Sequence, residues 1–177
     1  MSDRDRGKEM VEEMILEQVL EPISIVTDRV LTKEGLAGFP RVEGSPDFVV
    51  GFDGRALGIE VTEVRDVVES VEYYEEALRL ALKKSESYRR RHLFANPIAL
   101  VMYSKDPPLF EIQTELAAMG AEMDFEGTGF AEVWAVDFSD AYYRVGHPLR
   151  YPDLFCFKPM SDFGFHRVGG YDRKPFG

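Results

Sequence analysis

The chain has 177 residues and a net charge of −11, and apolar residues make up 45% of it. This size suits one globular domain that buries its own core, and the single cysteine, Cys156, excludes an intrachain disulfide. The negative charge repels polyanions at long range, which counts against a general nucleic-acid-binding surface. The sequence contains neither a run of 18 apolar residues nor a secretory leader pattern. We therefore expect a cytoplasmic protein with no membrane partner.

The N-terminal part of the chain predicts a helix followed by a short strand and a loop. Apolar residues recur at helical spacing over residues 5–20, with glutamates between them. Pro22 is expected to end this helix, because the residue before a proline disfavours the helical conformation. Residues 24–26 include two β-branched residues and could form a short strand. The glycines and the proline of residues 35–44 indicate a loop.

The clearest element is a β-hairpin over residues 47–64. Residues 47–52 and 57–64 are rich in β-formers, and Asp53 and Gly54 between them are typical of a two-residue turn. Pairing across that turn places Asp47 opposite Glu60, as cross-strand neighbours about 5 Å apart.

The remaining elements alternate between helix and strand. We expect a long helix over residues 68–92, a strand over 97–103, a second helix over 110–119 and a strand over 130–138. From about residue 139 the chain is rich in aromatic residues, glycine and proline without a clear period, which indicates an irregular C-terminal extension. The order predicts a single α/β domain over residues 1–177, with a core of about 5–138 and helices on both faces of a mixed sheet.

Two carboxylates of the hairpin form a candidate metal site. Because side chains alternate along a strand, Glu60 and Thr62 share one face, and Ile59 and Val61 point to the other, apolar face. A carboxylate among apolar strand residues is costly to bury unless it is paired or wet. Asp47 alone would suggest only a turn or a strand start. As a close pair, however, the two acids repel each other unless a cation or a proton lies between them.

Such a pair of oxygen ligands suits Mg²⁺, which is usually held by one or two carboxylates together with substrate phosphate. A metal in this position can activate water and stabilise the charge of a phosphodiester displacement.

The hairpin resembles the signature of the PD-(D/E)xK nuclease superfamily. The similarity lies in the Pro46-Asp47 pair, the Gly-apolar-Glu-apolar approach at residues 58–61, and the exit into a long helix. It implies a restriction-endonuclease-like fold, a nucleic-acid substrate, and Asp47 and Glu60 as catalytic acids that bind Mg²⁺ or Mn²⁺. A glutamate of the first helix often joins the site in this family, and Glu13 and Glu17 are the two candidates here.

The sequence departs from the family signature at one position. The lysine that the family places two residues after the second acid is replaced by Thr62. In some relatives the lysine comes from the following helix, and Lys84 is the candidate because it shares a helical face with Tyr88 four residues later. Lys83 is turned about 100° away. Residues 84–88 also resemble a Gln-x-x-x-Tyr motif of some relatives, which implies that Tyr88, together with Thr62, contacts substrate.

Two functional hypotheses follow. The first is a nuclease-like protein that hydrolyses phosphodiester bonds with Mg²⁺, using Asp47, Glu60 and Lys84. The alternative is a catalytically inactive protein of the same fold, a binding or self-associating structural module that forms a homo-oligomer through its acidic surface and aromatic C-terminal segment. Under that alternative Lys84 is a solvated helix lysine. The basic run at residues 89–92 likewise suits either a solvated helix end or a phosphate contact.

Overall fold

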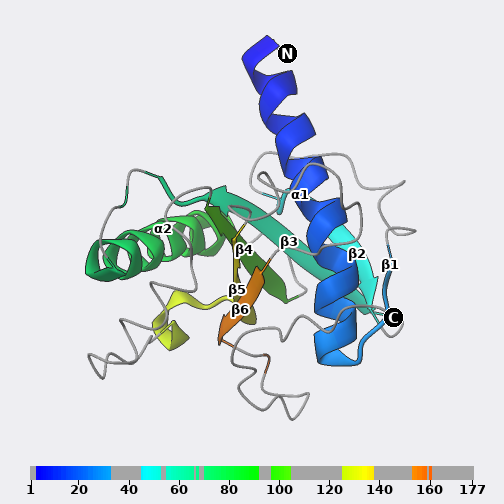
Figure 1. Ribbon diagram of the computed structural model, residues 1–177. Coiled ribbons are helices and arrows are strands. Elements are labelled where there is room, and N and C mark those ends of the chain that lie inside the picture. The colour runs from blue at the N-terminus through cyan, green and yellow to red at the C-terminus, as the bar shows by residue number, and fades with distance from the viewer. Residues whose placement is uncertain are drawn as a thin grey trace.

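The computed structural model describes residues 3–32, 45–52, 55–65, 67, 70–91, 97–104, 125–137, 153–158 and 160. These residues form an α/β structure in which one mixed six-stranded sheet lies between two helices (Figure 1). The elements, in chain order, are α1 (Asp3–Thr27), β1 (Leu31–Thr32), β2 (Phe48–Phe52), β3 (Arg55–Glu63), α2 (Ser70–Arg91), β4 (Ile98–Ser104), the 3₁₀ turn η2 (Glu126–Thr128), β5 (Glu132–Asp137) and β6 (Asp153–Lys158).

The strands lie in the sheet in the order in which they follow one another along the chain, from β1 to β6. The first three strands are antiparallel, β3, β4 and β5 are parallel, and β6 is antiparallel to β5. A parallel neighbour requires a crossover, and α2 lies on the crossover between β3 and β4. The expectation of a mixed sheet is therefore confirmed.

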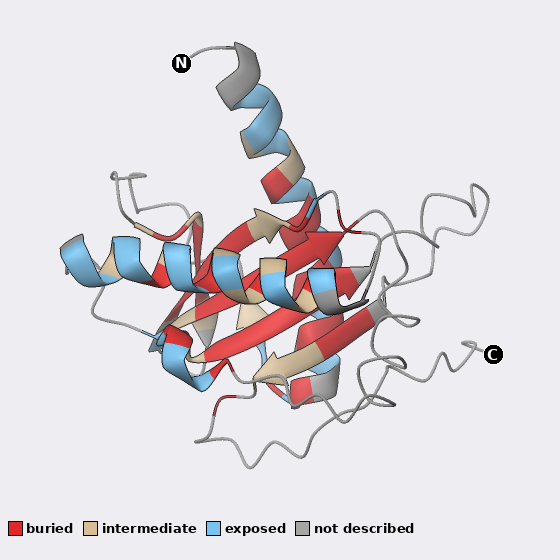
Figure 2. Cartoon of the chain, turned by 90° about the vertical axis from the view of Figure 1, so that its left-hand side faces the viewer, coloured by how far each residue is buried: buried red, intermediate tan, exposed pale blue. Residues whose placement is uncertain are grey.

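Each face of the sheet carries its own apolar core, and one helix covers each. Leu16 and Val19 of α1 pack with Ile59 and Val61 of β3 on one face. On the other face Tyr73 and Ala77 of α2 belong to the cluster that contains Leu100, Met102, Val133 and Ala135. Figure 2 shows the central strands as largely buried and the outer sides of both helices as exposed. Helices on both faces, as predicted, leave the central strands almost wholly apolar.

Helix α1 runs through Pro22 to Thr27, so the predicted end at Pro22 and the predicted strand directly after it are wrong. A proline inside a helix removes one backbone hydrogen bond and costs about 3 kcal/mol. Leu20 and Ile23 on either side of the proline are buried in the core, which offsets that cost. Ser24 Oγ donates to Leu20 O at 2.7 Å, and Thr27 Oγ1 donates to Ile23 O at 2.6 Å, so two carbonyls of this last part are satisfied locally.

The hairpin has the predicted register. Phe48 pairs with Ile59 and Phe52 with Arg55, so two residues, Asp53 and Gly54, connect the strands and lie outside the described residues. Continuation of the same register places Asp47, the residue directly before β2, opposite Glu60.

The C-terminal segment contributes a strand that the sequence pattern did not predict. β6 pairs with β5, with Leu154 in the core under α1 and Phe155 in the core under α2. Since both faces of β6 are covered, apolar and polar residues do not alternate along it, and the sequence pattern therefore indicated an irregular segment. The predicted loop over 35–44 and the predicted helix over 110–119 lie outside the described residues.

Candidate functional site

Glu60 lies on the α2 side of the sheet, in the middle of β3. Its strand neighbours Ile59 and Val61 belong to the core under α1, so alternation directs Glu60 to the other face, as predicted. It is only 4% exposed. A carboxylate buried to this degree needs partners inside the protein.

Two side chains of α2 supply those partners. Lys84 Nζ donates to one carboxylate oxygen of Glu60, and the hydroxyl of Tyr88 donates to the other. The two donors stand one helical turn apart, which is why both reach the same carboxylate. Lys84 therefore points to the Glu60 face of the sheet, as predicted, while Lys83 is exposed.

Asp47 is fixed at the edge where β2 begins. Its Oδ2 accepts a hydrogen bond from the backbone N–H of Val61 at 2.9 Å. The backbone pairing of β2 with β3 begins at Phe48, so this side-chain bond extends the contact between the two segments by one residue. This bond holds Asp47 beside the segment of β3 that carries Glu60.

The two acids influence each other electrostatically. Burial raises the pKa of Glu60 above its usual value, and the negative charge of Asp47 raises it further, against the opposing effects of Lys84 and Tyr88. Burial also raises the pKa of Tyr88, and the charge of Glu60 adds to that rise. Tyr88 therefore keeps its proton at neutral pH and acts as a hydrogen-bond donor. A positive charge near both carboxylates would stabilise their ionised forms.

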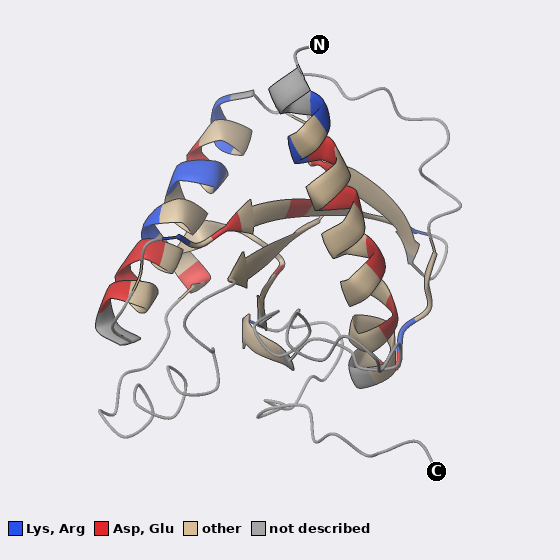
Figure 3. Ribbon diagram, turned by 45° about the horizontal axis from the view of Figure 1, so that its top comes forward, with Lys and Arg blue, Asp and Glu red and all other residues tan. Residues whose placement is uncertain are grey.

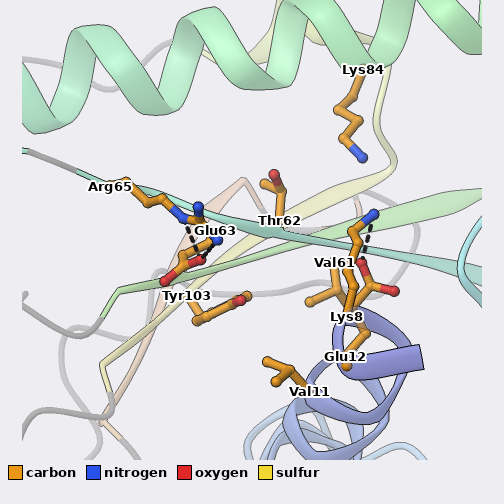
Figure 4. A pocket seen from close by; sticks show the side chains of 10 residues that line it. Lys8, Val11, Glu12, Val61, Thr62, Glu63, Arg65, Lys84 and Tyr103 are labelled. Carbon is orange, nitrogen blue, oxygen red and sulfur yellow. Dashed lines mark hydrogen bonds and ion pairs between the residues drawn. The ribbon is translucent and has the colours of Figure 1, made fainter. Parts of the chain in front are cut away.

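A pocket of about 580 Å³ opens beside this pair, between the N-terminal part of α1 and α2 (Figure 4). Thr62 and Lys84 face it from the α2 side, and Lys8 and Glu12 face it from the α1 side. The remaining residues around it are Gly7, Val11, Val61, Glu63, Arg65 and Tyr103. Of the two residues expected to contact substrate, Thr62 thus lines the pocket, and Tyr88 instead donates its hydroxyl to Glu60.

Lys8 and Glu12 are site residues that the sequence pattern did not single out. Lys8 Nζ lies 3.0 Å from Glu12 Oε1, one helical turn away. This hydrogen bond raises the pKa of Lys8, and the charges of Asp47 and Glu60 raise it further, so the ammonium lies within the field of both acids.

The first-helix glutamate at the pocket is Glu12, whereas the candidates Glu13 and Glu17 are exposed. Glu12 is 4% exposed because it precedes the buried Ile15 and Leu16 by three and four residues and shares their face. That spacing is the signal that could have distinguished Glu12 from its neighbours.

The basic run at the end of α2 is largely engaged within the protein. Arg89 Nη2 donates to the carbonyl of Gly127 in η2 at 2.9 Å, and Arg90 pairs with Glu86 one turn earlier. Figure 3 shows the basic residues gathered on one part of α2 and acidic residues along α1. In the described residues, the run thus serves local contacts of the helix end. The side chain of Arg91 and all of His92 lie outside the described residues.

Cys156 lies near a buried ion pair on the α1 side of the sheet. Arg29 Nη2 and Glu132 Oε2 are 2.8 Å apart, and both side chains are almost fully buried. Burial raises the pKa of the half-buried Cys156 thiol to about 12, and the charge of Glu132 contributes. The thiol is therefore protonated and weakly nucleophilic at neutral pH.

Comparison with protein-family models, curated proteins and solved structures gives no match. In the described part of the chain, no three His, Cys, Asp or Glu side chains gather closely enough to form a metal-binding group. None of the helices in these described residues has the length and apolarity required to cross a membrane.

Proposed function

We propose that the protein is a divalent-metal-dependent phosphodiester hydrolase of the PD-(D/E)xK nuclease superfamily, with a restriction-endonuclease-like core. Asp47 and Glu60 hold Mg²⁺ or Mn²⁺, and Lys84 provides the positive charge for the reacting phosphate. The observation that carries this proposal is the bond from Lys84 Nζ to Glu60. It brings the ammonium of Lys84 from α2 to the carboxylate of Glu60. Thr62, at the position of the family's lysine, has no positive charge to offer there.

The order of the elements supports the assignment to this fold. From α1 to β5 the chain forms a helix, the two-residue strand β1, an antiparallel hairpin, a long crossover helix and two further strands, β4 and β5, which are parallel to β3 and separated by η2. This order agrees with the common core that the resemblance implied, and it places the two acids on the hairpin next to the crossover helix.

The chemistry of the two acids fits a hard divalent cation. Both offer oxygen ligands, and Mg²⁺ is commonly held by one or two carboxylates while it keeps several waters. The charge of Asp47 raises the pKa of Glu60, which is the repulsion that a cation would relieve. When bound, the metal would supply activation of water at neutral pH.

The protein's own side chains orient the site and bind the substrate. Val61 N–H fixes Asp47, and the protonated Tyr88 hydroxyl fixes Glu60. Lys84 has three N–H donors, of which one goes to Glu60, so the others can bind a phosphate oxygen. A cation in this position stabilises the negative charge that develops on the phosphate in the transition state.

A catalytically inactive, self-associating module remains the second candidate function, and one observation favours it. Both carboxylate oxygens of Glu60 already accept hydrogen bonds from α2. A buried carboxylate that is satisfied in this way can serve to fasten α2 to the sheet without any metal.

The two candidates are distinguished by hydrolysis of DNA, RNA and dinucleotide substrates in millimolar Mn²⁺, for the wild type, Lys84→Ala and the neighbouring control Lys83→Ala. We expect metal-dependent cleavage that falls about a hundredfold or more in Lys84→Ala, because one charge stabilising the transition state is lost. Lys83→Ala should retain the wild-type rate. Absence of cleavage by the wild type on every substrate would leave the structural module as the function.

A further inference from the structure

Positively charged side chains stand at both ends of the pocket beside the acids. Figure 4 shows Lys84 and Lys8 at one end and Arg65 at the other, with Thr62 between them. Lys84 bonds Glu60 directly, and the charges of Asp47 and Glu60 act on the ammonium of Lys8. Arg65 belongs to the end formed by Glu63 and Tyr103.

Each of these ends can hold an anion in addition to its present contacts. Lys8 bonds Glu12 and Lys84 bonds Glu60, but an ammonium has three donors and a guanidinium has five. Burial raises the pKa of Tyr103 to about 12, and its hydroxyl keeps its proton and donates a hydrogen bond to Glu63. The guanidinium of Arg65 bonds Glu63, and its remaining N–H donors are what this end offers to an anion.

The surroundings of the pocket are unfavourable to a long polyanion. The chain carries a net charge of −11, and the exposed side of α1 bears Glu13, Glu17 and Glu21 at intervals of one turn. Figure 3 shows this acidic row. A long nucleic acid is bound mainly by neutralising many phosphates, which needs an extended basic surface. Arg89 and Arg90 of α2 are engaged with the protein itself, as described above.

We propose that the pocket binds a short phosphodiester with two phosphate groups, such as a 5′-phosphorylated dinucleotide, with its diester at Lys84 and Lys8 and its terminal phosphate at Arg65. This inference rests on the proposed function, because it takes the acid pair as the reacting end of the pocket. The volume of about 580 Å³ is in the range of small-molecule sites. Arg65 then selects substrates by their terminal phosphate and does not take part in hydrolysis.

The test is calorimetric binding of the thymidine dinucleotides TpT and pTpT in EDTA, so that neither metal nor cleavage intervenes. The wild type should bind pTpT about tenfold more tightly than TpT, because the terminal phosphate gains a charge-assisted bond to Arg65. Arg65→Ala should bind both ligands with the affinity that the wild type has for TpT. Arg79→Ala is the matched control, since Arg79 is likewise an exposed arginine paired with a nearby glutamate, and it should keep the preference.

The affinity for longer oligothymidylates distinguishes a pocket for a short ligand from a surface that binds a polymer. Affinity should not increase once a ligand carries two phosphates. A steady increase with length, or a preference for pTpT that survives in Arg65→Ala, would overturn the inference, as would the absence of binding by pTpT. If the cleavage rate does not depend on oligonucleotide length and is unchanged in Arg65→Ala, the inference about Arg65 is overturned while the hydrolase proposal stands. Arg65-dependent binding of pTpT without Mn²⁺-dependent hydrolysis would leave the pocket assignment intact and refute the hydrolase.

Discussion

Lys84 on α2 donates a hydrogen bond from Nζ to Oε1 of Glu60 on β3, across 24 positions of the chain. The Glu60 side chain is only 5% exposed and that of Lys84 is 31% exposed, so the pair joins a buried anion to a cation that still reaches the pocket. This one contact both fastens α2 to the sheet and brings an ammonium to the candidate site.

Lys84→Ala should destabilise the fold by about 1–3 kcal/mol. Removal of one partner from a fully buried ion pair costs about 3–5 kcal/mol, and the partial exposure of Lys84 reduces that cost. Urea unfolding of this variant beside Lys83→Ala, which changes an exposed lysine, measures the difference. Equal stability of the two variants would show that the bond to Glu60 contributes nothing to the fold.

The pH dependence of stability should reveal the raised pKa of Glu60. Because the folded protein holds this proton more tightly than the unfolded chain, whose carboxyl has a pKa of about 4.5, Glu60 lowers the stability as pH rises through that value toward the folded pKa. Glu60→Gln removes this dependence. The wild type should therefore lose stability relative to Glu60→Gln as pH rises above about 4.5.

Urea unfolding of both proteins at each pH measures that difference, and subtraction cancels the contributions of the other groups. A difference that stays constant, or one that changes in favour of the wild type as pH rises, would contradict the raised pKa.

Tyr88→Phe should cost about 1 kcal/mol of folding free energy, because the buried Glu60 loses one donor. The ring itself is kept, and with it the edge-to-face contact with Phe130 at 6.2 Å. Tyr74→Phe is the control, since Tyr74 makes a similar contact with Phe125 at 6.3 Å from a position about 21 Å away along the same helix. Chemical denaturation of both variants should show the larger loss for Tyr88→Phe. Equal losses would argue against the bond to Glu60.

The buried pair of Arg29 and Glu132 should respond differently to single and double replacement. Arg29→Met leaves a carboxylate uncompensated in the core, which costs about 3–5 kcal/mol. The double variant Arg29→Met, Glu132→Leu should recover most of that loss, because it leaves neither charge unpaired. Thermal unfolding measures both, and a double variant less stable than Arg29→Met would show that the pair contributes more than it costs to bury.

The hairpin could be predicted from local geometry, whereas Lys84 became a candidate through the family resemblance, which implied that the lysine can come from the following helix. A two-residue turn sets the register between Phe48 and Ile59, and helical periodicity sets Lys84 beside Tyr88. These two rules act over a few residues, and the resemblance supplied the expectation that this helix reaches the acids.

The features that the sequence did not predict depend on tertiary burial. α1 continues through Pro22 because Leu20 and Ile23 are buried, which no local rule reveals. β6 lacks alternation because both of its faces are covered. Glu12 lies three and four residues before Ile15 and Leu16, and that spacing distinguishes it from Glu13 once the burial of both apolar residues is known.

The most direct test of the central claim is the melting temperature with and without millimolar Mn²⁺ for the wild type, Glu60→Gln and the control Glu76→Gln, whose half-buried carboxylate pairs with Arg79 on α2. Metal at a hundredfold excess over its Kd stabilises the native state by about 2.7 kcal/mol, which corresponds to roughly 5–10 °C in a domain of this size. We predict that increase for the wild type and Glu76→Gln, and none for Glu60→Gln. An equal increase in all three proteins, or no increase in the wild type, would contradict a metal site at Asp47 and Glu60.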